Sequence, residues 1–209
     1  MPLDLWLAFV AASTALLLIP GPTVLLVLSY ALGKGRSVAV ASAAGVALGD
    51  LIAMTASLAG LGALVATSAT LFSLLKWIGA AYLVWLGVKL WRSAPRSGLR
   101  HLTPADDVTA HGVFAHAAMV TALNPKSIAF FIAFVPQFLR PEAPLTPQFV
   151  ILVATFVGLA AVNALAYALL ADRLRQWIGR PRVVAGLTRG GGAALIGMGL
   201  ATAVLRRPV

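Results

Sequence analysis

The chain has 209 residues and a formal net charge of +10, yet only 11% of its residues are charged and 60% are apolar. A typical soluble domain contains about 25% charged residues, so these few polar groups would not cover a compact globule in water. The composition excludes an ordinary cytosolic enzyme, and the mean hydropathy of +0.94 indicates an integral membrane protein.

The sixteen Lys and Arg residues lie mostly in short segments between apolar runs. Membrane proteins keep the cations that fix their orientation in such segments, whereas a nucleic-acid-binding protein gathers them on one surface. We therefore expect the lipid bilayer as a partner, and no nucleic acid. Because the sequence has no cysteine, disulfides and thiolate metal sites are excluded.

Six apolar segments are long enough to cross the bilayer, which takes about 20 residues per helix. We expect an all-α integral membrane protein in which residues 1–209 form a single transmembrane domain. The division between the second and third segments, near 66–70, rests only on length and weakly polar residues. The expected spans are 5–31, 38–64, 71–91, 113–139, 146–171 and 187–205.

The connectors between these spans alternate in charge. The first, third and fifth carry Lys and Arg, the second carries no charge, and Arg140 in the fourth is balanced by Glu142. The positive-inside rule places the odd connectors in the cytoplasm and both termini in the periplasm. Arg206 and Arg207 at the outer C-terminus do not fit this rule, so the direction of the last span stays open.

A polar cytoplasmic linker at 92–112 divides the chain into halves at 5–91 and 113–205, with three spans each. Because each half has an odd number of spans, the second half must be inverted in the membrane relative to the first. This topology permits the inverted repeat that many secondary transporters have, and we expect two inverted three-helix repeats.

Both halves contain a proline motif near the middle of their first span. Proline removes a backbone donor and clashes with the preceding turn, so each motif should break its helix. Broken helices at matching positions of two halves are typical of a transporter's binding site. Structural kinks without a ligand are the alternative, since proline is common in transmembrane helices. The motifs are Pro20-Gly21-Pro22 in the first span and Asn124-Pro125-Lys126 in the fourth.

The residue types also predict how each helix resumes. Asn is a preferred N-cap and Pro is favoured at the first helical position, so Asn124-Pro125 should begin a half-helix. Gly21-Pro22 can be interpreted in the same way. Each restart would aim backbone N–H groups and the positive end of a helix dipole at the membrane interior, where a carboxylate can be held.

Asp50 lies near the centre of the second span, where a carboxylate is costly and needs a partner. Lys126 is the candidate partner, either in a structural ion bridge or in a site where Asp50 binds an ammonium or a proton and Lys126 a carboxylate. Asn163 lies in the fifth span at about the place that Asp50 has in the second. It could bind the substrate, or form a hydrogen bond between helices. Lys76 is a less certain site residue, because it lies near enough to the interface to snorkel.

Other functions have weaker support in the sequence. A passive channel would need a continuous polar lining, and an exporter of metal ions or other small solutes would need its own set of ligands. The sequence shows no constellation of a nucleophile with its base, no nucleotide-binding loop and no metal-ligand spacing, so we expect neither an enzyme nor a cofactor. Gly45-x-x-x-Gly49 and Gly186-x-x-x-Gly190 permit close helix approach within one chain or between two, which leaves a homodimer open.

Several motifs together resemble the LysE/RhtB family of bacterial amino-acid exporters. They are Pro20-Gly21-Pro22, Gly45-x-x-x-Gly49-Asp50, the segment 75–87, and Leu123-Asn124-Pro125-Lys126 followed by Phe130-Phe131 and Pro136-Gln137-Phe138. The resemblance covers nearly the whole chain. It implies export of basic or neutral amino acids, or related metabolites, across the inner membrane with the proton-motive force as the energy source. It does not choose among these substrates.

Overall fold

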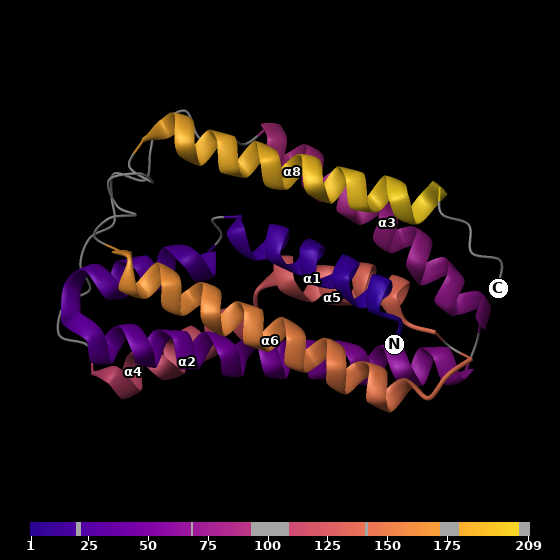
Figure 1. Cartoon of the computed structure of the whole chain (residues 1–209), viewed down its shortest axis with the longest axis horizontal. Helices are drawn as coiled ribbons and strands as arrows, with labels where there is room; N and C mark the ends of the chain where they lie inside the picture. Colours follow the sequence, from indigo (N-terminus) through magenta and orange to yellow (C-terminus); the bar gives the residue numbers. More distant parts are fainter. Residues whose placement is uncertain (20–21, 68, 93–108, 141, 172–179, 205–209) are drawn as a thin grey trace.

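The computed structural model describes residues 1–19, 22–67, 69–92, 109–140, 142–171 and 180–204; within them, side chains at 22, 32–36, 64–67, 69, 71–73, 75–76, 181 and 201–204 are left out. The described residues form helices and contain no strand, which confirms the all-α prediction (Figure 1). The elements are α1 (Leu3–Leu18), α2 (Pro22–Thr67), α3 (Ala69–Arg92), α4 (Ala110–Ala122), α5 (Pro125–Phe134), η1 (Val135–Phe138), α6 (Leu145–Leu169) and α8 (Pro181–Val204).

Three helical segments among the described residues are long and apolar enough to cross a membrane: Ser37–Ala63, Leu145–Leu169 and Arg182–Leu200. Two bent pairs raise the number to as many as five. Leu3–Leu18 meets Thr23–Ala31 at 58°, and Ala110–Ala122 meets Pro125–Phe138 at 44°. The chain is therefore a multi-pass membrane protein, whereas six spans in two inverted repeats stay a prediction. Both bends fall at the predicted proline motifs.

The connector expected between the first two spans is helical. α2 is helical over all 46 residues from Pro22 to Thr67. The helix curves back on itself at the left of Figure 1. Val24 and Val27 near its start consequently pack in one cluster with Ala39 and Val46 from beyond the curve.

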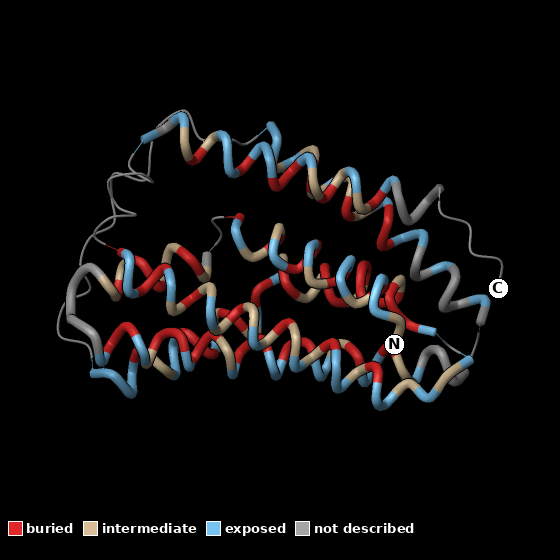
Figure 2. Tube along the Cα trace, in the orientation of Figure 1, coloured by how far each residue is buried: buried red, intermediate tan, exposed pale blue. Residues whose placement is uncertain are grey.

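The helices are arranged in layers. α3 and α8 run side by side at the top of Figure 1, α1 and α5 lie between, and α2, α4 and α6 pack below. The buried residues line the inner sides of the helices and the exposed ones face outward, as Figure 2 shows. Many outward side chains are large and apolar, such as Trp77 and Val162, which suits lipid rather than water.

Aromatic rings fill the space beside the two bends. Phe131 packs edge-on against Phe156 of α6 with ring centroids 4.8 Å apart. Phe138 of η1 packs in the same manner against Phe9 of α1, at 5.2 Å. These contacts hold α5 against α6 and η1 against α1.

Candidate functional site

The second break has the capped restart that the sequence predicts. Asn124 is in an extended conformation, and its Oδ1 accepts a hydrogen bond from the Lys126 N–H at 3.0 Å. Pro125 is the first residue of α5, where its missing N–H costs no hydrogen bond. The predicted half-helix at Asn124-Pro125 is thus confirmed.

The first break separates the end of α1 from the start of α2. Ile19 caps α1 in an extended conformation, and α2 begins at Pro22, as expected for a restart. The other two residues of the motif, Pro20 and Gly21, lie outside the described residues. Thr23 occupies the first turn of α2.

The two breaks are in direct contact. Asn124 Nδ2 donates to Thr23 Oγ1 at 3.2 Å, and a pocket opens beside this bond. Its empty space totals about 480 Å³, open solvent at the mouth included. The pocket unites four predicted site residues, Asp50, Asn124, Lys126 and Asn163, with ten others: Leu16, Leu17, Thr23, Val24, Val27, Val46, Ser127, Ala160, Ala164 and Tyr167.

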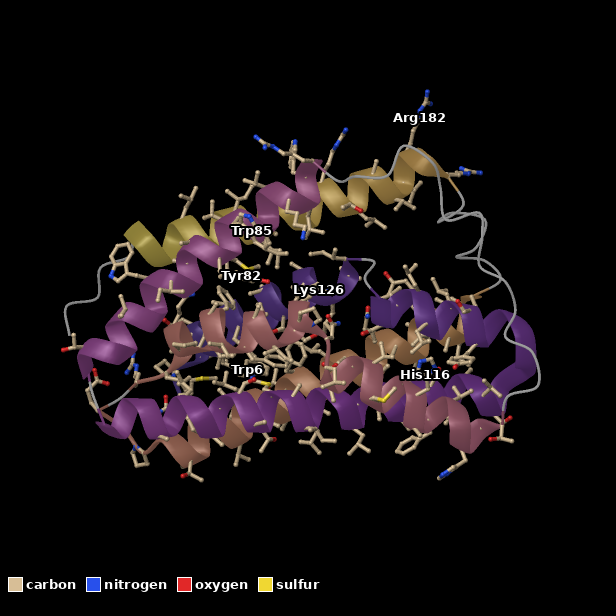
Figure 3. All side chains as sticks on the ribbon, turned by 180° about the vertical axis from the view of Figure 1, so that it is seen from behind. Trp6, Tyr82, Trp85, His116, Lys126 and Arg182 are labelled. Atoms are coloured by element: carbon tan, nitrogen blue, oxygen red, sulfur yellow. The ribbon has the colours of Figure 1, made fainter. Side chains whose placement is uncertain are left out.

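Side chains from α5 and α6 satisfy the carbonyl groups at the end of α1. Lys126 Nζ donates to the carbonyls of Leu16 and Ile19, at 3.2 and 3.4 Å. Asn163 Nδ2 donates to the Leu17 carbonyl at 3.2 Å, so it does bond between helices while also lining the pocket. In Figure 3 Lys126 lies in the interior near mid-length of the molecule, whereas the Arg182 side chain points away from it.

Asp50 reaches the pocket because α2 packs directly on the backbone of α4. A Cβ on Gly49 would lie 2.5 Å from the Ala118 carbonyl oxygen, and one on Gly45 would meet the carbonyl of Phe114. Only glycine permits this close approach. Asp50 is 3% exposed, and its Oδ1 has no hydrogen-bond partner.

Of the two alternatives for Asp50 and Lys126, the described residues show no direct ion bridge: the Lys126 ammonium donates to the Leu16 and Ile19 carbonyls, and Asp50 Oδ1 has no hydrogen-bond partner. The two charges face the same pocket and attract each other across it. The reason for the separation is that the carbonyls at the end of α1 offer the Lys126 ammonium two acceptors.

Sequence reasoning missed three polar residues of the pocket: Thr23, Ser127 and Tyr167. Two of them directly follow the proline motifs, and Tyr167 lies one helical turn beyond Asn163 on the same face of α6. Tyr167 donates its hydroxyl to the Leu18 carbonyl at 3.3 Å. The side chain of Lys76 lies outside the described part of the chain, so its predicted role stays open.

The second glycine pair behaves differently from the first. A Cβ on Gly186 or Gly190 would meet no atom within 4 Å, so these glycines do not mediate packing within the described chain. Nor do the described residues contain a group of three His, Cys, Asp or Glu side chains placed to hold a metal ion.

A pocket that holds buried polar side chains between two helix breaks of a multi-pass membrane protein is typical of small-solute transporters. The chain matches the LysE type translocator family over residues 14–206. It is 37% identical to a homoserine/homoserine lactone efflux protein of Salmonella typhimurium, over 97% of this chain and 98% of that protein. The chain belongs to the LysE type translocator family.

Two further relatives match over most of their length. A leucine efflux protein of Salmonella typhimurium is 31% identical, over 94% of this chain and 90% of that protein. A membrane protein of Vibrio cholerae, called uncharacterized, is 33% identical over 99% of this chain and 100% of that protein. No solved structure matches the chain.

Proposed function

We propose that this protein exports neutral amino acids, or closely related metabolites, from the cytoplasm across the bacterial inner membrane by secondary active transport. The observation that carries the proposal is the buried carboxylate of Asp50, which faces the pocket between the two breaks without a hydrogen bond to its Oδ1. An unpaired buried charge is costly, and it is a ready partner for the ammonium group of a substrate. Membership of the family and the names of two relatives support the same conclusion.

The pocket provides a partner for each end of an amino-acid zwitterion. Asp50 binds the ammonium, and the start of α5 binds the carboxylate. Pro125 has no N–H and the Lys126 N–H donates to Asn124, so Ser127 supplies the N–H and hydroxyl nearest the helix start. The Lys126 ammonium supplies the opposite charge.

The remaining wall of the pocket favours an uncharged substrate side chain. Val24, Val27, Val46 and Ala164 are apolar, and Asp50 is the only carboxylate among the described lining residues. Once Asp50 binds the α-ammonium, no second anion remains for the side chain of lysine or arginine. We therefore favour neutral over basic amino acids.

Transport then follows from the inverted repeat. The halves 5–91 and 113–205 rock around the fixed pocket, which opens first to the cytoplasm and then to the periplasm, where both termini lie. Asp50 carries the substrate ammonium outward and a proton inward, so that export is driven by the proton gradient. A metal-ion exporter has less support, because one carboxylate in the lining is too few hard ligands for a dehydrated divalent cation.

Efflux from cells that lack their own amino-acid exporters tests the proposal. Cells expressing the protein should survive toxic internal levels of leucine or homoserine, and should release them into the medium. The Asp50→Asn variant should lose export against a gradient, while the exposed control Asp4→Asn should keep it. Normal uphill export by Asp50→Asn would refute the coupling role, and no efflux of any amine-carboxylate compound by the natural chain would refute the function.

A further inference from the structure

The carbonyl groups at the end of α1 hold a primary ammonium, that of Lys126. A helix C-terminus carries partial negative charge and lacks backbone donors for its last carbonyls. At this end the Lys126 ammonium bridges Leu16 O and Ile19 O. The two carbonyls between them, Leu17 O and Leu18 O, accept from Asn163 and Tyr167 instead. Another ammonium could therefore replace Lys126 while these two hydrogen bonds remain in place.

Lys126 is held at these carbonyls by long hydrogen bonds. The two distances, 3.2 and 3.4 Å, lie at or beyond the upper end of the usual range for an N–H···O bond. An ammonium has three donors, and two of them are used here. Asp50 lines the same pocket, is almost fully buried, and has an oxygen without a partner.

We propose that Leu16 O and Ile19 O, together with Asp50, form the amine subsite of the pocket, and that the Lys126 ammonium occupies the carbonyl side of this subsite, out of contact with Asp50, until substrate arrives. The proposal rests on the proposed function and adds the order of events. The substrate ammonium binds between Asp50 and the two carbonyls and displaces Lys126 from them. The displaced Lys126 then turns to the substrate carboxylate at the start of α5.

The exchange keeps the charges balanced. The empty pocket holds one carboxylate and one ammonium, which are not in contact, and a zwitterion adds one of each. After the exchange every charge has an opposite partner. A substrate that lacks either the amine or the carboxylate leaves one buried charge unpaired, so it should bind more weakly than the zwitterion.

Chemical rescue tests the subsite independently of transport. The Lys126→Ala variant removes the tethered ammonium and opens space for a small diffusible one. Its melting temperature in detergent should fall, and n-propylammonium chloride should restore at least half of the loss in a saturable manner. Propionate and tetramethylammonium at equal concentration should not, because the first is an anion and the second has no N–H.

Lys89→Ala is the matched control. Lys89 is an exposed cation of α3 that lies 5.0 Å from the Trp85 ring centroid, away from the pocket. Its variant should show no stabilisation by n-propylammonium. Equal responses of the two variants, or no response of Lys126→Ala, would overturn the subsite.

A second variant, Lys126→Met, keeps most of the apolar stem. Isopentylammonium, which is leucine without its carboxylate, should bind this variant about tenfold more tightly than the natural chain, because a tethered competitor is gone. Leucine itself should bind less tightly, since its carboxylate loses Lys126. Unchanged or weaker isopentylammonium binding contradicts the proposal. So does failure of both Lys126 variants to fold even when n-propylammonium is present throughout extraction.

Flux in proteoliposomes separates the two proposals. If the natural chain releases no neutral amino acid while n-propylammonium still rescues Lys126→Ala, the proposed function fails and the amine subsite stands. If leucine is exported but the rescue is absent, the subsite fails and the function stands.

Discussion

Asn124 Nδ2 donates a hydrogen bond to Thr23 Oγ1 across 3.2 Å, and this bond joins two helix breaks that are 101 residues apart in the chain. The Oδ1 of the same side chain caps α5. One amide therefore holds the start of α5 and the first turn of α2 together at the wall of the pocket. A shift of either break will be transmitted to the other.

Substitutions of Asn124 should separate its two contacts. Asn124→Ser keeps a capping oxygen and loses the amide donor to Thr23, whereas Asn124→Ala loses both. We expect the alanine variant to be less stable than the serine variant by about 1 kcal/mol, the usual contribution of an N-cap. Thermal unfolding of the purified protein measures the difference.

Thr23→Val reports on the bond between the breaks without touching the cap. It should impair export about as much as Asn124→Ser. Thr14→Val is its control, because the exposed Thr14 hydroxyl bonds only to the Val10 carbonyl of its own helix. Full activity of Thr23→Val would mean that the bond does not couple the breaks.

Gly49→Ala should separate α2 from α4 and displace Asp50. The added methyl would lie 2.5 Å from the Ala118 carbonyl oxygen and 2.6 Å from the Thr121 Cβ. Overpacking of this kind typically costs about 1–3 kcal/mol, and we expect export to fall with stability. Gly60→Ala, in the same helix but with no atom within 4 Å, should be tolerated. Equal melting temperatures for the two variants would show that the contact is not tight.

Asp50→Asn should abolish uphill export with little change in the melting temperature, because two effects oppose each other. The natural carboxylate is buried with one oxygen unpaired, a cost that the uncharged amide removes, but the variant also loses the opposite charge that attracts the Lys126 ammonium across the pocket. A side chain that is kept although it lowers the stability of the fold usually serves the function of the protein. Marked destabilisation of the variant would instead indicate a structural role for the carboxylate.

The expected topology can be mapped with single cysteines, since the natural chain has none. An impermeant maleimide added outside intact spheroplasts should label Leu3→Cys and Glu142→Cys, which belong to the expected periplasmic side. His111→Cys, at the cytoplasmic linker, should react only after the membrane is permeabilised. All three positions are exposed in the structure. If His111→Cys were the only variant labelled from outside, the protein would have the opposite orientation in the membrane.

The breaks and their chemistry were predictable because proline and asparagine act locally. Pro125 and Asn124 determine where a helix begins through their own backbone and side-chain bonds, whatever surrounds them. The position of Asp50 on the pocket was foreseeable for a similar reason, since a carboxylate in a membrane span must face the protein interior.

The contacts between distant segments were not predictable in the same way. The acceptor of Lys126 depends on where α1 ends, and Leu16 lies 110 residues earlier in the chain. From residue types alone, Asp50 was the obvious candidate partner for Lys126, yet the Lys126 ammonium donates to backbone carbonyls. Backbone acceptors are present at every position, so composition gives no signal of which one a side chain will reach. The continuous course of α2 likewise depends on packing after the curve.

Glycine contacts make two helix pairs mechanically stiff. Gly87 of α3 and Gly192 of α8 each lie against the other's carbonyl oxygen, as Gly49 lies against the backbone of α4. Each of these contacts joins a helix of the first half to a helix of the second. Where backbones touch, no side-chain rotamer is available to absorb a displacement, so the halves can pivot about the glycines but cannot slide past each other there. The glycine contacts therefore serve as hinges for the rocking that opens and closes the pocket.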